Sequence, residues 1–225
     1  MSALLKQARV LLPEFLARLT VRRESGPLDS VEALCRFVST RAAFIAQKTL
    51  YNYLKTRMGT RYPSMFEDDM FIASIDIAKL HVYTACLADL AIFAAWQVRQ
   101  EAAEPLAPED CKALALHCFR RGLEDNAAPA EAVESFSAAE ALADFERRLA
   151  FRDWDAGPQG VDIFSESPAA LVRWAPIAPE LKQFDQEIVE NSIKFKWRDV
   201  RRDLGKRLDA AAVARQACQL GRAAA

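Results

Sequence analysis

The sequence predicts an all-α protein, a multi-helix bundle, from three observations. The 225-residue chain has only seven glycines, and residues that favour helix, such as Ala, Leu, Arg and Glu, are abundant. Apolar residues recur at the spacing of helical faces over several long stretches, whereas no useful length of alternating apolar and polar residues indicates a strand. We therefore expect a single helical domain over residues 1–225, built around a long antiparallel helical hairpin and a long C-terminal helix.

Residues 1–28 are expected to form a basic amphipathic helix at the periphery of this domain. Apolar residues lie on a broad stripe between residues 3 and 23, most basic residues lie off it, and Ser25-Gly26-Pro27 ends it. Basic amphipathic helices bind anionic membrane surfaces or grooves of partner proteins, and packing on the helix's own bundle is the alternative. The candidate partner-binding residues here are Leu4, Leu5, Leu11, Leu12 and Phe15.

The hairpin is predicted from two helical stretches, at about 30–58 and 66–101. Asp29 is a suitable N-cap for the first helix, Glu32 completes a capping box, and Gly59 is a natural C-cap. The acidic run Glu67-Asp68-Asp69 suits the start of the second helix, where the helix dipole favours negative charge. This second helix is apolar almost all round, which is typical of the central helix of a bundle.

Seven-residue repeats on both helices predict the register of the hairpin. In an antiparallel pair, opposed residue numbers share one sum, and a single sum places Lys55 against Asp69, Lys48 against Asp76 and Arg41 against Tyr83. The same sum places Tyr51, Phe44 and Phe37 against Ala73, Leu80 and Leu87. We expect a seam that is part apolar and part ionic, with its register set by Arg41, Lys48, Lys55, Asp69 and Asp76; a polar ligand cavity is the alternative use of these charges.

Beyond the hairpin, helices are expected near 108–123 and 129–152, followed by a surface loop at 153–167 and a short helix through about Trp174. A last long helix is expected over about 179–217. Its apolar face would carry Leu181, Phe184, Ile188, Ile193, Trp197, Val200, Leu204 and Leu208. The connector containing Trp174 and Ile177 is a second candidate partner contact, unless the protein's own core covers these side chains.

Charge and cysteine content narrow the functional classes. Lys plus Arg is 30 and Asp plus Glu is 31, so the chain lacks the global basic field of nucleic-acid binders, and nucleic acid is not an expected partner. The basic cluster Lys194–Arg207 is interleaved with aspartates, as in a solvated helix face. Five scattered cysteines without C-x-x-C fit a reducing compartment, and we expect a cytoplasmic protein. High Ala and Arg usage is typical of GC-rich bacteria.

The apolar run from residue 71 to 96 is interrupted by four ionisable residues, so we do not expect a transmembrane helix. The N-terminal stretch lacks the compact apolar core and cleavage motif of a secretory signal.

Four residues of the second hairpin helix are the candidate catalytic set: Asp76, Lys79, His81 and Tyr83. His81 could act as a base and Tyr83 as a proton donor. The competing interpretation is structural, because Asp76 and Lys79 lie three residues apart and can pair on one helix. The Glu-x-x-His signature of di-iron bundles is absent, and so are nucleophile-elbow, P-loop and dinucleotide motifs, so no metal or cofactor is expected.

Two functional hypotheses follow. The first is a non-catalytic helical-bundle adaptor or assembly protein that binds a protein partner or a second copy, with the cytoplasmic membrane surface as a further contact. The alternative is a helical enzyme, for example a hydrolase, or a small-ligand-binding protein with a polar pocket around Asp76 and His81. The geometry of these two residues discriminates between the hypotheses, because an active site requires them to line one cavity.

Overall fold

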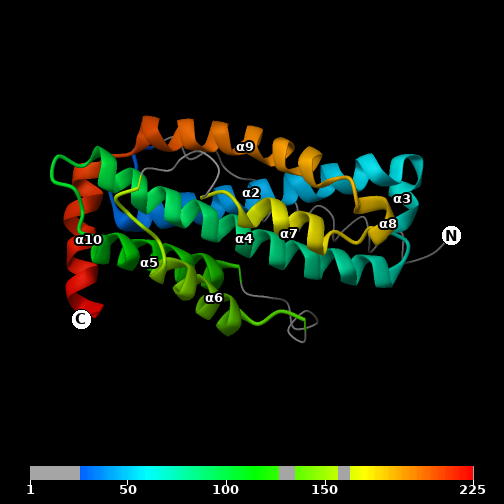
Figure 1. Cartoon of the computed structure of the whole chain (residues 1–225), viewed down its shortest axis with the longest axis horizontal. Coiled ribbons are helices and arrows are strands. Elements are labelled where there is room, and N and C mark those ends of the chain that lie inside the picture. The colour runs from blue at the N-terminus through cyan, green and yellow to red at the C-terminus, as the bar shows by residue number, and fades with distance from the viewer. Residues whose placement is uncertain (1–25, 127–134, 157–162, 225) are drawn as a thin grey trace.

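The computed structural model describes residues 26–126, 135–156 and 163–224, which form an elongated bundle of α-helices (Figure 1). Within these ranges the structure contains no β-strand, only an isolated bridge between Leu28 and Leu208. The predicted all-α bundle is confirmed. The N-terminal candidates Leu4, Leu5, Leu11, Leu12 and Phe15 lie outside the described residues.

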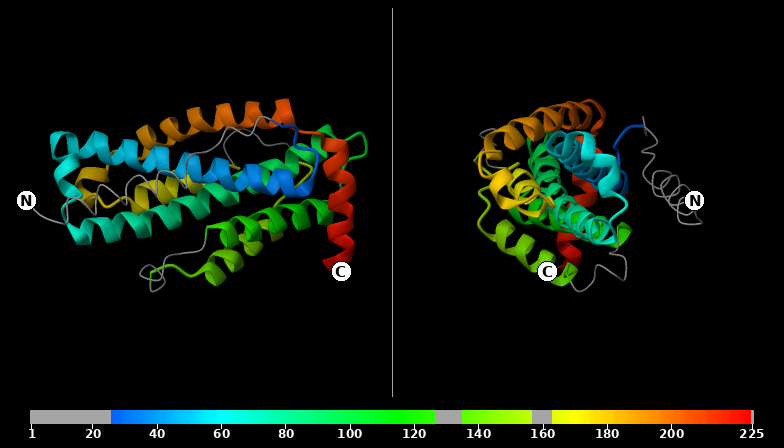
Figure 2. Two further views of the ribbon diagram at one scale, coloured as in Figure 1. Left: turned by 180° about the vertical axis from the view of Figure 1, so that it is seen from behind. Right: turned by 90° about the vertical axis from the view of Figure 1, so that its right-hand side faces the viewer.

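Two long antiparallel helices, α2 (Val31–Met58) and α4 (Asp69–Glu101), run along the length of the molecule (Figures 1 and 2). A 3₁₀ turn (Gly59–Arg61) and the short α3 (Tyr62–Met65) join them. Gly59 ends α2 at φ 54°, a left-handed value that favours glycine. Asp68 caps α4, whereas the N-cap of α2 is Ser30 and not the predicted Asp29. The hairpin itself is as the sequence predicts.

The register predicted for the hairpin is wrong in its ionic part. Asp76 pairs with Lys79 of its own helix at 2.7 Å and not with Lys48. Arg41 pairs at 2.8 Å with Asp203, far along the chain, and not with Tyr83. Lys48, Lys55 and Asp69 are all exposed, and so, at 38%, is Phe44, which was expected to face Leu80 in the seam.

The reason is that two basic residues of α2, Arg41 and Arg57, face another helix. Arg41 lies beside α9 (Gln186–Arg207), where Asp203 accepts its hydrogen bond, and Arg57 reaches Asp185 just before α9 begins. The ionic seam therefore joins α2 to α9. The α2–α4 seam instead uses a neighbouring face of α2, from which Ser39 contacts Tyr83 at 3.2 Å. Seven-residue repeats occur on both faces, and the sequence alone did not distinguish between them.

The other helices surround the hairpin. Helices α5 (Pro108–Asp125) and α6 (Ala138–Ala150) lie along one side, and α7 (Glu166–Trp174), α8 (Pro179–Lys182) and α9 lie along the other (Figures 1 and 2). Helix α10 (Ala210–Ala224) crosses one end of the bundle. This arrangement leaves α9 on the outside of the molecule.

The long helix expected at 179–217 is divided into α8, α9 and α10. The break between α9 and α10 is held by the segment before α2: the Leu28 amide donates to the Arg207 carbonyl at 2.8 Å, and the Asp209 amide donates to the Leu28 carbonyl at 3.0 Å. Leu28 is almost fully buried. The spacing of apolar residues along a helix does not reveal a contact with a residue so far away in the sequence. The break was therefore not predicted, and one continuous helix was expected.

Two surface assignments made from the sequence are corrected by burial. The segment 153–167 is not a simple surface loop, because Trp154, Ile163 and Phe164 are all buried in the core. The connector is also covered by the bundle: Ile177 is 9% exposed, and Trp174 packs partly buried against the core. Cys35, Cys86, Cys111 and Cys118 are buried free thiols, which pack as small apolar side chains.

Helix α4 fills the centre of the bundle, which explains its almost uniformly apolar composition. It is the one helix within the described ranges that is long and apolar enough to cross a membrane, and 67% of its most apolar window is buried inside the protein. Helix α4 contacts α2, α5 and α7 most extensively.

Candidate functional site

Among the residues that the structure describes, Asp76 and His81, the centre of the alternative enzyme hypothesis, contact different neighbours. Asp76 and Lys79 form a partly buried ion pair, with the Lys79 ammonium 5.7 Å from the centre of the Tyr51 ring. His81 is five residues further along α4, which places it about 140° around the helix from Asp76. The two side chains therefore face different neighbours. In the structural interpretation, Asp76 pairs with Lys79 and does not act together with His81.

His81 packs into an aromatic stack. Its ring lies parallel to Trp174 with 3.5 Å between ring centroids, and its Nε2 lies 3.0 Å from the Ser135 carbonyl oxygen. Burial lowers the pKa of His81 and is the largest influence on it. The nearby Arg173 guanidinium also lowers this pKa. His81 is thus a packing residue that holds α7 against α4.

Tyr83 belongs to a third environment, a buried hydrogen-bond network. Its hydroxyl donates to the Gly122 carbonyl at 2.8 Å, accepts from Asn126 Nδ2 at 2.8 Å, and lies 3.2 Å from the Ser39 hydroxyl. Burial raises the pKa of Tyr83 well above its usual value. A phenol held neutral with this many fixed partners is suited to joining α2, α4 and α5.

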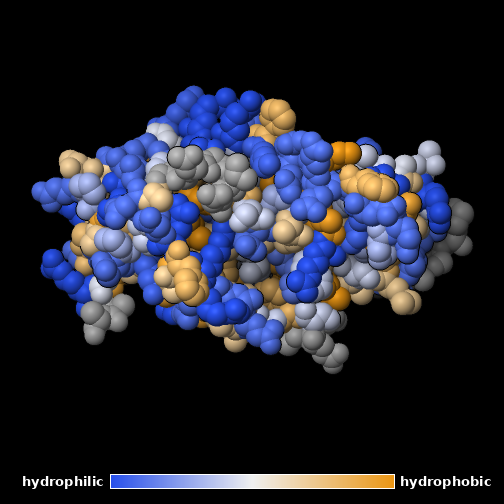
Figure 3. All heavy atoms as spheres, in the orientation of Figure 1, coloured by the Kyte–Doolittle hydropathy of each residue, from blue (hydrophilic) through white to orange (hydrophobic). Residues whose placement is uncertain are grey.

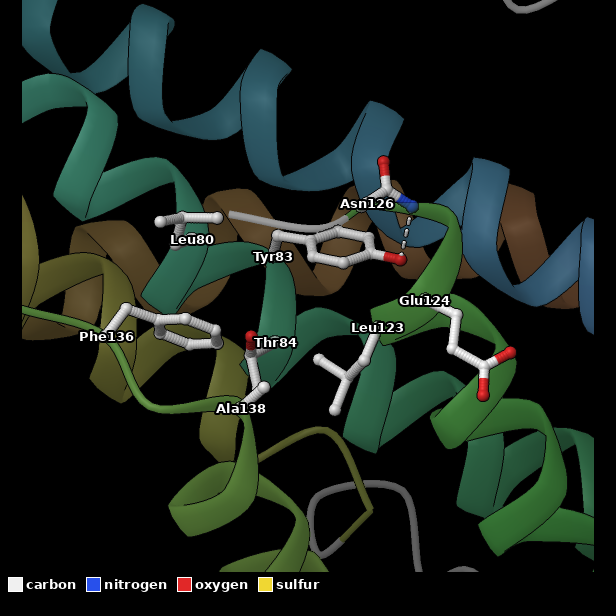
Figure 4. Close-up of a pocket in the computed structure, with 8 residues that line it drawn as sticks. All are labelled: Leu80, Tyr83, Thr84, Leu123, Glu124, Asn126, Phe136 and Ala138. Carbon is white, nitrogen blue, oxygen red and sulfur yellow. Dashed lines mark hydrogen bonds between the residues drawn. The ribbon is translucent and has the colours of Figure 1, made fainter. Parts of the chain in front are cut away.

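The network borders a small cavity, shown in Figure 4. Its volume is about 230 Å³, below the roughly 300–1,000 Å³ of most ligand sites. Its lining is mainly apolar and consists of Leu80, Tyr83, Thr84, Leu123, Glu124, Asn126, Phe136 and Ala138. Because neither Asp76 nor His81 lines this cavity, it does not assemble the acid–base set that the enzyme hypothesis needs.

The most deeply buried charged group, Asp89, was missed as a candidate. It is fully buried on α4, where it accepts a hydrogen bond from the Ser167 amide at 2.9 Å and lies 2.9 Å from Arg148 Nη1. Ser167 in turn accepts a hydrogen bond from Trp197 Nε1 at 3.0 Å. This network joins α4, α6, α7 and α9. A carboxylate in an apolar run signals a buried partner, but its partners are distant in the sequence.

The most distinctive surface feature is an exposed set of large apolar side chains, which we call the α8–α9 apolar face. It consists of Leu181 (57% exposed), Phe184 (81%), Ile188 (68%) and Phe195 (63%). Figure 3 shows separate apolar spots near α8 and the N-terminal half of α9, with hydrophilic atoms between them, beside a strongly hydrophilic region over the rest of α9. Large apolar side chains exposed near one another are candidates for an interaction site.

The apolar face lies opposite the side of α9 that fills the core. At about 100° per residue, Ile188 and Phe195 fall within about 20° of each other, and Phe184 lies in the turn just before the helix. The buried residues Val189, Ile193, Trp197, Val200 and Leu204 lie about half a turn away. The single apolar face predicted for this helix is therefore two faces. Leu181, Phe184 and Ile188 belong to the outer face, and the predicted residues from Ile193 to Leu204 belong to the inner face.

Several basic residues of α9 pair with acidic residues of the same helix. Arg202 pairs with Asp199 at 2.9 Å, and Arg207 lies 3.6 Å from Asp203. Burial, followed by the neighbouring Lys48 ammonium, lowers the pKa of Lys196. The alternation of charge favours a solvated helix face, as the sequence indicated.

The described residues contain no group of three or more His, Cys, Asp or Glu side chains placed to hold a metal ion. Comparisons with protein-family profiles, curated proteins and solved structures found no match to this chain. Its function must therefore be argued from the surface and interior of the molecule itself.

Proposed function

We propose that this protein is a non-catalytic helical-bundle adaptor or assembly protein that binds a protein partner through the α8–α9 apolar face. The observation that carries the proposal is that four large apolar side chains are exposed on α8, on the turn after it and on the outer side of α9, whose inner side already fills the core. Fully burying a side chain of this size contributes about 1.5–3 kcal/mol, so covering this face is a substantial driving force for association.

The interior supports the same proposal. The residues of the alternative enzyme hypothesis are divided among an ion pair, an aromatic stack and a buried hydrogen-bond network. Each has a structural role in its own place. The alternative of small-ligand binding would depend on the cavity beside Tyr83. The volume of this cavity suits only a ligand smaller than most cofactors.

The test compares partner binding by the wild-type chain and by a Phe184→Asp/Phe195→Asp variant. Phe151→Asp is the matched control, since Phe151 is 90% exposed and lies outside the apolar face. The tagged full-length proteins are recovered at native expression from soluble and membrane fractions, and any stoichiometric partner is then purified and its binding measured directly. Thermal unfolding establishes that all variants are folded.

We expect a purified partner protein to bind the wild-type chain and the Phe151→Asp control and to lose affinity for the double variant. Binding that is unchanged by the double variant would overturn the proposal. So would retention on vesicles of anionic lipid, lost with the double variant, without any protein partner, because the face would then be a membrane contact.

A further inference from the structure

The exposed side of α9 carries the spacing of a coiled-coil seam. Ile188, Asn191, Phe195, Arg198 and Arg202 follow one another at alternating intervals of three and four residues, and all are exposed. Phe184, in the turn just before α9, extends the series by one more interval of four. Alternating intervals of three and four keep a stripe of side chains facing one neighbouring helix. The core does not use this stripe, because it contacts the opposite side of α9.

The composition of the stripe selects one orientation for self-pairing. It is apolar from Phe184 to Phe195, with Asn191 as a polar member, and then basic at Arg198 and Arg202. Two copies in parallel would place each arginine against its own equivalent, which is repulsive. An antiparallel arrangement avoids this contact and overlaps the apolar halves.

In the antiparallel arrangement, one constant sum of residue numbers serves the whole apolar segment. Phe184 faces the second copy's Phe195, and Ile188 faces the second copy's Asn191, with the same two layers repeated by symmetry. Aromatic pairs therefore close both ends of the contact. A polar Asn within such a seam restricts the register at some cost in stability.

The charges beside the seam fit the same arrangement. Glu187 and Lys194 each precede a seam residue, lie seven residues apart, and are exposed. Antiparallel pairing brings Glu187 of each copy beside Lys194 of the other, so symmetry produces two identical ion pairs. Lys194 has an exposed contact of 3.4 Å with Glu190 of its own helix, and such surface pairs are weak enough to exchange.

We propose that the partner of the α8–α9 apolar face is a second copy of this chain, docked with α9 antiparallel to α9. This inference rests on the proposed function and names the partner. The contact is isologous and closes as a two-fold dimer. Because only about three helical turns overlap, the interface is smaller than the roughly 1,600 Å² of stable complexes, and we expect micromolar rather than nanomolar affinity.

The test is sedimentation velocity of the full-length protein from about 5 to 500 µM, a range suited to a micromolar dissociation constant. We expect the wild-type and Phe151→Asp proteins to convert from monomer to dimer across this range, and Phe195→Asp to stay monomeric. Glu187→Lys should weaken dimerisation about tenfold, and Glu187→Lys combined with Lys194→Glu should restore most of it, because the exchange recreates both ion pairs.

A wild-type chain that stays monomeric at all concentrations would overturn the inference. A dimer that survives Phe195→Asp, or a charge exchange no better than Glu187→Lys alone, would also overturn it. These failures are distinguishable from failure of the proposed function. If the wild-type chain is monomeric but a purified heterologous partner depends on Phe184 and Phe195, the proposed function stands and the second copy is excluded; if no partner depends on them, both fail.

Discussion

The buried carboxyl of Asp89 makes a prediction about the pH dependence of stability. Burial raises its folded-state pKa from 3.8 to about 6, while the Arg148 guanidinium and the Ser167 hydrogen bonds act in the opposite direction. Between these two pKa values the folded protein holds a proton that the unfolded chain has released. Stability is therefore lost as the pH rises from about 4 to about 6.5. A difference of about two pKa units corresponds to at most about 3 kcal/mol.

Asp89→Asn isolates this contribution, because the amide has a similar shape but does not ionise. Urea unfolding of both proteins, followed by circular dichroism from pH 4 to pH 8, gives two free energies of unfolding at each pH. Their difference cancels the titration of groups that behave alike in both proteins. We expect the variant to gain up to about 3 kcal/mol relative to the wild type across this range.

Two outcomes would refute the reasoning. A difference that does not change with pH would show that burial and the Arg148 pair balance. A variant that loses stability relative to the wild type as the pH rises would show that Arg148 dominates and holds the folded pKa below its usual value. In either case Asp89 would be a conventional buried ion pair.

Three further predictions concern packing and pairing, each measured as a change in the free energy of unfolding. Gly122→Ala should destabilise the protein by about 1–3 kcal/mol, because its Cβ would lie 2.6 Å from Leu87 Cδ1. Gly205→Ala should instead stabilise the protein by about 0.5–1 kcal/mol, because its Cβ would lie 3.8 Å from the nearest atom. Equal effects of the two substitutions would contradict the packing. Asp185→Ala removes a carboxylate that is 1% exposed and accepts hydrogen bonds from Tyr53 and Arg57, so it should lower the free energy of unfolding by about 2–4 kcal/mol. Asp199→Ala removes an exposed carboxylate and should lower it by less than about 0.5 kcal/mol. Arg41→Asp and Asp203→Arg should partly rescue each other in a double-mutant cycle, whereas Lys48→Asp and Asp76→Lys should add independently; rescue of the second pair would restore the predicted hairpin register.

Helix positions were predictable because their signals are local. Gly59 ends α2 where its backbone freedom is needed, and acidic residues begin α4 where the dipole favours them. The uniform apolarity of α4 correctly indicated a central helix. These properties depend on residues within one or two helical turns, which a single sequence displays.

Pairing between helices was less predictable, because each long helix has several faces that fit a partner. The row containing Arg41 was assigned to α4, but it lies beside α9, and Asp203 supplies the carboxylate. The break after α9 depends on Leu28, almost the whole chain away. The local sequence pattern does not distinguish these partners from the partners on α4, or the unbroken helix, that the sequence analysis predicted.

The candidate site shows the same division. Phe184 and Ile188 were recognised as apolar helical positions, but grouping them with Ile193 and Trp197 on one face was wrong, because even a continuous helix places them about half a turn from those residues. The burial of Trp197 shows which side of α9 faces the core. Exposure of an apolar residue is a tertiary property, and the structure was needed to find the α8–α9 apolar face.

The most direct test of the central claim is hydroxyl-radical footprinting of Phe184 and Phe195 in the cell and in the dilute purified protein, read out by mass spectrometry with Phe151 as the internal reference. All three rings are more than half exposed in the free chain. A face that binds a partner predicts that Phe184 and Phe195 are strongly protected relative to Phe151 in the cell and lose this protection in the dilute protein. Equal modification of the three rings in both settings would contradict the claim that this face is the protein's working surface.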